Sequence, residues 1–162
     1  MNQTIPIPQK RHNSIPQDVI KSKPKEAEMF QWIASRYPYL NFYWNPTRYK
    51  IDWVVTDSNN KPVAWMEAKY RLRYKLNDFN DLVVNLDKWM YGVEVSDKTG
   101  VPFTIIQADS DGRYWTYTAN KDDITKGKIF IKRDGRSKHQ RDWQDLDVFV
   151  HIPNYLWTDH SG

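Results

Sequence analysis

A short turn between two strand-like runs constrains the fold of this chain more than any other feature. Residues 49–56 and 63–70 are rich in Ile, Val, Trp and Tyr, the residue types that favour β-strands. Residues 57–62, which connect them, are Asp, Ser, Asn, Asn, Lys and Pro, and these favour turns. So short a connection predicts an antiparallel β-hairpin.

Three charged residues interrupt or border these apolar runs. Glu67 and Lys69 are two positions apart, so their side chains project from the same face of the strand. A hairpin with a four-residue loop places Asp52 opposite Glu67, with their Cβ atoms roughly 5 Å apart. Facing carboxylates repel each other unless a cation lies between them, and Mg²⁺ prefers such oxygen ligands while keeping several waters. The pattern predicts a divalent-metal site at Asp52 and Glu67.

Lys69 adds a candidate catalytic group to this predicted metal site. A lysine beside such an ion can orient or help to deprotonate a bound water, and can stabilise charge that builds on phosphorus. Asp52, Glu67 and Lys69 together therefore indicate a phosphodiester-cleaving centre. Surface charge on an exposed strand edge and structural ion-pair networks produce similar clusters. Structural ion pairs without catalysis are the alternative explanation.

A helix before the hairpin supplies a candidate third acid. Residues 25–36 fit a helix that begins after Pro24 and ends before Pro38. At 100° per residue, one face gathers Met29, Phe30, Ile33 and Tyr37. Glu26 lies on this apolar face, where an unpaired acid is costly, whereas Glu28 lies nearly opposite. The helical phase therefore favours Glu26 as the third acid, whereas a one-residue kink in the helix would favour Glu28.

The rest of the chain predicts one long helix and several strands. The helix is expected to begin at Asn77 or Asp78, to end near Lys98, and to stop at Gly100. The expected strands are residues 101–108, 113–118, 128–132 and 146–152. Residues 1–24 contain four prolines and scattered basic residues, which predicts a flexible basic arm. Residues 25–162 are expected to form a single domain, with core motifs in 25–108 and C-terminal strands and loops in 109–162.

Composition excludes some chemistries. The chain has no cysteine, so disulfides, thiolate catalysis and cysteine-based zinc sites are excluded. The net charge of +4 is compatible with a polyanionic partner. No run approaches 18 apolar residues, so we expect no membrane association. The expected location is the cytoplasm, which is the host cell cytoplasm if a phage encodes the chain.

The order of these features resembles the PD-(D/E)XK nuclease superfamily. A helix with Glu, a strand with Asp, a turn, a strand ending in Glu-x-Lys, a long helix and a strand follow one another across residues 25–108. The later segment, residues 85–103, is similar to small phage-type members of that superfamily. One departure is Ile51, which stands where the superfamily motif has proline before Asp52.

The resemblance implies an α/β fold: a restriction-endonuclease-like mixed β-sheet flanked by helices, with an αβββαβ-type core. It implies that Asp52 and Glu67 bind Mg²⁺ or Mn²⁺ together with the carbonyl group of Ala68, and that Glu26 completes the metal shell or acts through a water. Lys69 would position the attacking water. The implied activity is a Mg²⁺-dependent DNA endonuclease, and exonuclease action stays open. Cleavage of both strands by this class often implies a homodimer.

Two basic clusters are candidate DNA contacts. They are Arg71, Arg73 and Lys75 after the second hairpin strand, and Lys132, Arg133, Arg136 and Lys138 near the C-terminus. Each cluster is also explained as a solvated surface. The alternative function is a non-catalytic nucleic-acid-binding or phage assembly protein on a nuclease-like scaffold, because a fold does not fix its function.

Overall fold

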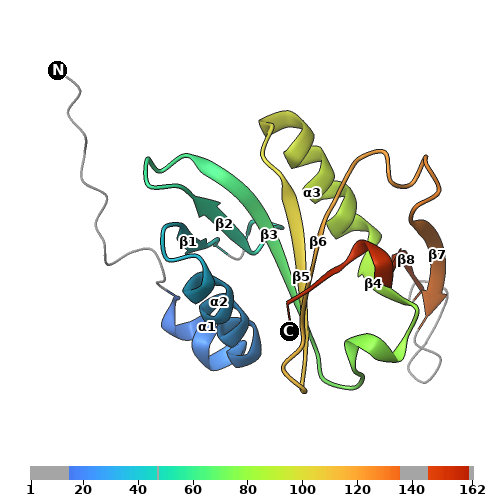
Figure 1. The fold of residues 1–162 in the computed structure, drawn as a ribbon, viewed down its shortest axis with the longest axis horizontal. Coiled ribbons are helices and arrows are strands. Elements are labelled where there is room, and N and C mark those ends of the chain that lie inside the picture. Colours follow the sequence, from blue (N-terminus) through green and yellow to red (C-terminus); the bar gives the residue numbers. More distant parts are fainter. Residues whose placement is uncertain (1–14, 47, 136–145, 161–162) are drawn as a thin grey trace.

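The computed structural model describes residues 15–46, 48–135 and 146–160. Figure 1 shows how its helices and strands are arranged. The helices are α1 (Gln17–Ser22), α2 (Pro24–Arg36) and α3 (Leu86–Thr99), with short 3₁₀ turns at Leu76–Asp78 and Asn154–Leu156. The strands are β1 (Asn41–Trp44), β2 (Trp53–Thr56), β3 (Pro62–Arg71), β4 (Asp81–Asn85), β5 (Phe103–Asp109), β6 (Tyr114–Thr118), β7 (Phe130–Gly135), β8 (Leu146–Pro153) and β9 (Thr158–Asp159).

Six strands form a main sheet in the order β1-β2-β3-β5-β6-β9. The β3–β5 pair is parallel and the other pairs are antiparallel, so the sheet is mixed. Helix α2 packs on one face of this sheet, and α3 lies on the other face with a small sheet of order β4-β8-β7 (Figure 1). The run from α2 to β5 contains the αβββαβ-type core, so the expected restriction-endonuclease-like α/β fold is confirmed.

The hairpin has the predicted register. Trp53 pairs with Met66, Val54 with Trp65, and Val55 with Ala64. The ladder shifts by one residue between Val55 and Thr56, where Thr56 pairs with Pro62, so β3 carries one extra residue at this point. Strand β2 begins later than the apolar run indicates, so Asp52 lies just before its first residue instead of within it.

The predicted long helix from Asn77 or Asp78 is wrong. Its first part is a 3₁₀ turn and then β4, and only the second part is helical. Burial alternates along β4, where Leu82 and Val84 are buried and pair with Ile152 and Val150 of β8. Helical spacing and strand alternation overlap in this short apolar segment, and the distant strand β8 selects the extended form.

The ends of α3 follow local capping chemistry. The Asn85 side chain accepts a hydrogen bond from the Asp87 backbone N–H at 2.9 Å, so Asn85 is the residue that caps the helix. Gly100 ends the helix with a φ of 70°, which confirms the predicted stop.

The predicted arm is partly helical. Helix α1 lies within residues 1–24, and α2 begins at Pro24. Ile15, just before α1, packs against the core beneath α2. Residues 1–14 of the predicted arm lie outside the described residues.

Two apolar cores lie on opposite faces of the main sheet. One packs α2 against β1, β2, β3 and β5. The other packs α3 and the small sheet against β5 and β6. At its centre, Gly92 of α3 faces the fully buried ring of Phe103 on β5. This contact fixes how closely α3 approaches the sheet.

Candidate active site

The segment before β2 is shaped so that Asp52 leaves the strand. The Asn45 side chain donates a hydrogen bond to the Ile51 carbonyl at 3.0 Å, and the Asn45 backbone N–H donates to the Asp52 carbonyl at 2.8 Å. Ile51 is buried in the core next to α3. An apolar residue at this position therefore has a packing role where the superfamily motif has proline.

The Asp52 side chain bonds to the backbone of β3, as a neighbouring strand would. Its Oδ2 accepts a hydrogen bond at 3.0 Å from the Ala68 backbone N–H. The N–H and C=O groups of a strand residue point to the same edge of the strand, so the Ala68 carbonyl faces the same side. The Asp52 carboxylate and the Ala68 carbonyl are thereby brought together just before β2 begins.

Glu67 has one engaged oxygen and one open oxygen. Its Oε1 lies 3.0 Å from the Lys88 Nζ on α3, and only 13% of its side chain is exposed. Its Oε2 is buried and forms no hydrogen bond among the described residues, although the Asp52 backbone N–H lies near the carboxyl group and acts to lower its pKa. An unpartnered buried carboxylate oxygen is costly, so this atom fits a ligand such as a cation.

Burial raises the pKa values of both acids. For Asp52, burial outweighs the lowering effects of the Ala68 N–H and Lys88, and the nearby Glu26 charge raises the pKa further. For Glu67, burial and then the Asp52 charge raise the pKa to about 7. The two carboxylates, here called the acidic pair, are thus close enough to repel each other in a poorly solvated place. A divalent cation would relieve that repulsion.

The raised Glu67 pKa gives a pH prediction for the protein in EDTA. Between the ordinary pKa of 4.5 and the folded value of about 7, the folded state binds more protons than the unfolded state. The contribution of Glu67 to the free energy of unfolding therefore falls as the pH rises through this window. We expect E67Q to remove this part of the pH dependence. Thermal denaturation in EDTA at pH 5 and pH 8 measures it, and equal changes in the wild type and E67Q would contradict it.

The structure places Glu26, and not Glu28, near the acidic pair. Glu26 lies in the first turn of α2, half-buried, and its charge acts on Asp52. Glu28 is exposed and lies 3.4 Å from the Lys25 Nζ. In the described part of the chain, no group of three or more Asp, Glu, His or Cys side chains is close enough to hold a metal. The candidate metal site therefore comprises two acids and a backbone carbonyl, with Glu26 nearby.

Lys69 lies on the same face of β3 as Glu67, with an exposed side chain. The structure gives its ammonium group no hydrogen bond or ion pair within residues 15–46, 48–135 and 146–160. This lysine is free to contact a water or a substrate phosphate.

The three basic residues that follow Lys69 differ in their surroundings. The Arg71 guanidinium is buried: its Nε donates to Gln107 Oε1 at 2.8 Å and its Nη2 to the Val83 carbonyl at 2.5 Å. Burial lowers its pKa. Arg73 is exposed. Lys75 binds Ser110 Oγ at 2.7 Å and Asp111 at 2.8 Å. Of the three, Arg73 is the residue whose charge is most available to a phosphate backbone.

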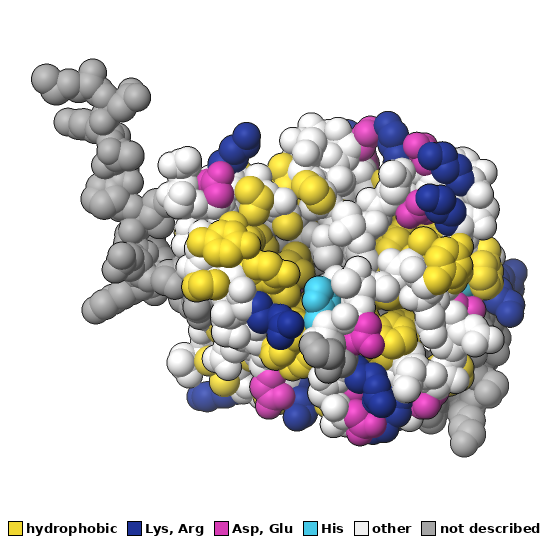
Figure 2. Space-filling model, viewed as in Figure 1, with side chains coloured by type: hydrophobic (Ala, Val, Ile, Leu, Met, Phe, Trp, Pro, Cys, Tyr) yellow, Lys and Arg dark blue, Asp and Glu magenta, His cyan; other side chains and the backbone are white. Residues whose placement is uncertain are grey.

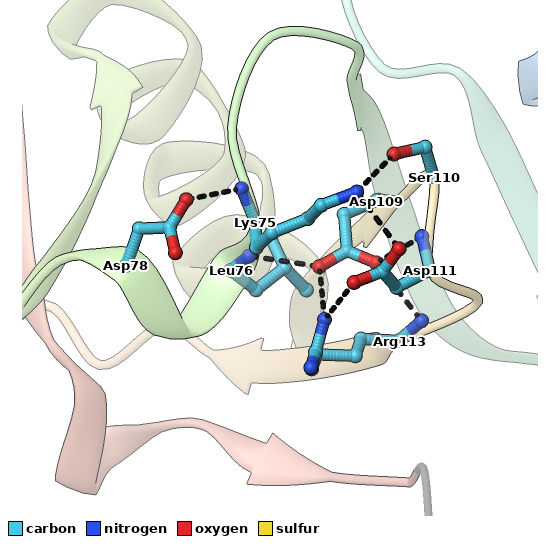
Figure 3. Close-up of polar contacts among 7 residues, drawn as sticks. All are labelled: Lys75, Leu76, Asp78, Asp109, Ser110, Asp111 and Arg113. Carbon is cyan, nitrogen blue, oxygen red and sulfur yellow. Dashed lines mark hydrogen bonds and ion pairs between the residues drawn. The ribbon is translucent and has the colours of Figure 1, made fainter.

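The contacts of Lys75 belong to a network at the β5–β6 turn (Figure 3). The buried Asp109 carboxylate accepts hydrogen bonds from the Leu76 backbone N–H at 2.8 Å and from Arg113 Nη1 at 3.3 Å. The same arginine also binds Asp111 at 3.0 Å. These contacts join the loop after β3 to the turn after β5, so the chain leaving the Glu67–Lys69 segment is held in place.

The second basic cluster is only partly described. Lys132 and Arg133 are exposed on β7 of the small sheet. Arg136 and Lys138 lie outside the described residues. On the face drawn in Figure 2, the basic side chains of the described residues alternate with acidic ones. A mixed surface of this kind favours local phosphate contacts over one long basic stripe.

The contact between Lys88 and Glu67 could not be recognised from the sequence. With a helix beginning at residue 77 or 78, Lys88 lies away from the apolar face, and the sequence leaves open whether it faces substrate or is simply exposed. Its position depends on α3 beginning at Leu86 and on the packing of α3 against β5 and the small-sheet strands β4 and β8. The one signal for this contact in the sequence is that Lys88 lies within residues 85–103, the segment that is similar to phage-type members of the superfamily.

No helix in the described ranges is long and apolar enough to cross a membrane. A family model described as "Phage putative PDDEXK endonuclease" matches residues 19–159. No curated protein and no solved structure matches the chain. The family match spans α2, the hairpin with the acidic pair, α3 and both sheets. The chain therefore belongs to this phage PD-(D/E)XK endonuclease family.

Proposed function

We propose that the chain is a Mg²⁺- or Mn²⁺-dependent DNA endonuclease whose centre is formed by Asp52, Glu67 and Lys69. One observation carries the proposal. Two carboxylates with raised pKa values lie together, one with a buried unpartnered oxygen, and an unengaged lysine projects from the same face of β3 as Glu67. The family membership favours a nuclease over a structural ion-pair cluster.

The donor set suits a hard divalent ion. Asp52, Glu67 and the Ala68 carbonyl offer only oxygen atoms, which Mg²⁺ and Mn²⁺ prefer. Glu26 does not group with the two acids closely enough to hold an ion with them directly, so it would complete the shell through a water. When bound, the ion supplies Lewis acidity and neutralises charge at the scissile phosphate.

The chain's own groups orient the reaction. The Ala68 N–H fixes the Asp52 carboxylate, leaving its second oxygen for the ion. The exposed Lys69 ammonium group can orient the attacking water and stabilise the negative charge that grows on the phosphoryl oxygens. Arg73, Lys132 and Arg133 are exposed cations that can bind the DNA backbone, so binding should weaken with salt. Cleavage of both strands would require two centres, which favours a homodimer.

The test is cleavage of supercoiled, linear, single-stranded and four-way-junction DNA with Mg²⁺ or Mn²⁺. We expect the wild type to cut at least one substrate and K69M to cut it on the order of 10²-fold more slowly, because the lysine acts mainly in the transition state. The matched control is K61M, which changes an exposed lysine in the turn of the same hairpin. We expect K61M to cut at the wild-type rate.

Two results would overturn the proposal. One is the absence of cleavage for every substrate with either ion, and the other is equal cleavage by K69M and the wild type. Salt-sensitive DNA binding without cleavage would instead support the non-catalytic binding protein.

A further inference from the structure

Lys88 is the one cation in direct contact with the acidic pair among the described residues. It occupies the first turn of α3, and its Nζ lies 3.0 Å from Glu67 Oε1. The same Nζ donates a hydrogen bond to the Lys50 carbonyl at 2.9 Å. The Lys50 ammonium group in turn lies 5.3 Å from the centre of the Tyr91 ring on α3. Lys88 therefore links α3 to β3 and to the segment that carries Asp52.

The ammonium group of Lys88 does part of what a metal ion would do. It neutralises one charge of the acidic pair and leaves Glu67 Oε2 without a partner. A cation bound between the two carboxylates would lie close to this ammonium group, and the two would repel each other. A monovalent ion that displaced the ammonium group from Glu67 would leave the positive charge next to the acidic pair unchanged, whereas a divalent ion would raise it by one.

We infer that Lys88 is a positioning residue that neutralises Glu67 until a divalent ion binds, and that the ion and the Lys88 ammonium group compete for this carboxylate. This inference rests on the proposed metal-dependent function and assigns Lys88 a role in it. The competition favours divalent over monovalent ions at the acidic pair. It also keeps Glu67 and the Lys50–Asp52 segment in place before the ion arrives.

Calorimetric titration with Mn²⁺ alone, without DNA, tests the competition. We expect K88M to bind Mn²⁺ about tenfold more tightly than the wild type, because a competing positive charge is removed. K88R keeps the charge and should bind like the wild type. The matched control is K98M, which removes a lysine from the same helix. Lys98 pairs with the exposed Glu94 and not with the acidic pair, so K98M should leave the affinity unchanged.

A double-mutant cycle of E67Q and K88M gives a second readout. The interaction between the two side chains should contribute to thermal stability in EDTA, and their coupling should fall in saturating Mn²⁺. Unchanged or weaker Mn²⁺ binding by K88M would overturn the role of Lys88 while leaving the proposed function intact. A wild type that binds no Mn²⁺ would overturn the metal-dependent function, and this inference with it.

Discussion

D52N should lower the rate of metal-dependent DNA cleavage on the order of 10³-fold without unfolding the protein. The asparagine oxygen can still accept the hydrogen bond from the Ala68 N–H that Asp52 accepts at 3.0 Å, so the segment that leads into β2 should stay in place. The charge that binds the cation is lost, however. The expected signature is a large loss of activity with a nearly unchanged thermal midpoint in EDTA.

Cleavage assays and thermal denaturation with and without Mn²⁺ check this result. Mn²⁺ should raise the midpoint of the wild type and should raise that of D52N much less, because an ion stabilises only the state that binds it. Two variants of α2 serve as matched controls. E26Q should weaken Mn²⁺ binding, whereas E28Q, which changes an exposed acid two residues away on the same helix, should not. A D52N protein that cuts DNA at the wild-type rate would contradict the assignment.

G92A should destabilise the protein by about 1–3 kcal/mol. A Cβ atom at Gly92 would lie 2.1 Å from Cε1 of Phe103, far inside van der Waals contact. The ring is fully buried, so it cannot turn into solvent to make room. Alanine favours a helix over glycine by roughly 1 kcal/mol, which offsets only part of this strain.

Urea denaturation of G92A measures the loss, and F103L provides the control. Leucine removes the ring atoms that the new Cβ would strike, although it also weakens packing in the core. The double variant should therefore lose less stability than the sum of the two single losses. Strict additivity would mean that the close contact with Phe103 is not the cause. Because Lys88 lies one turn before Gly92 on α3, the Glu67–Lys88 ion pair should weaken as well.

Local pattern was enough to predict the hairpin that carries the acidic pair. Its strands are neighbours in sequence, and its turn residues fix the pairing, so Trp53 opposite Met66 follows from the chain itself. Helix α2 was equally accessible, because prolines bound it and its apolar face repeats at helical spacing. The position of Glu26 near Asp52 follows from these two elements together.

Features that depend on distant partners could not be predicted. Strand β4 is extended because β8, some seventy positions later, pairs with it. The burial of Arg71 depends on Gln107 and on the carbonyl of Val83, neither of which its own strand reveals. Lys88 meets Glu67 only once α3 is docked on the main sheet. In each case the deciding contact joins segments whose spacing carries no periodic signal.

The pairing of β4 with β8 limits where this chain can be truncated for expression. A fragment ending at Ala108 would keep Asp52, Glu67, Lys69 and Lys88, and by motif alone it would look complete. It would nevertheless expose Leu82 and Val84, which Ile152 and Val150 cover in the intact chain. Such a truncation leaves β4 without its partner strand directly before α3, the helix that carries Lys88. A minimal folded unit therefore has to extend through residue 153, although no candidate metal ligand lies beyond β3.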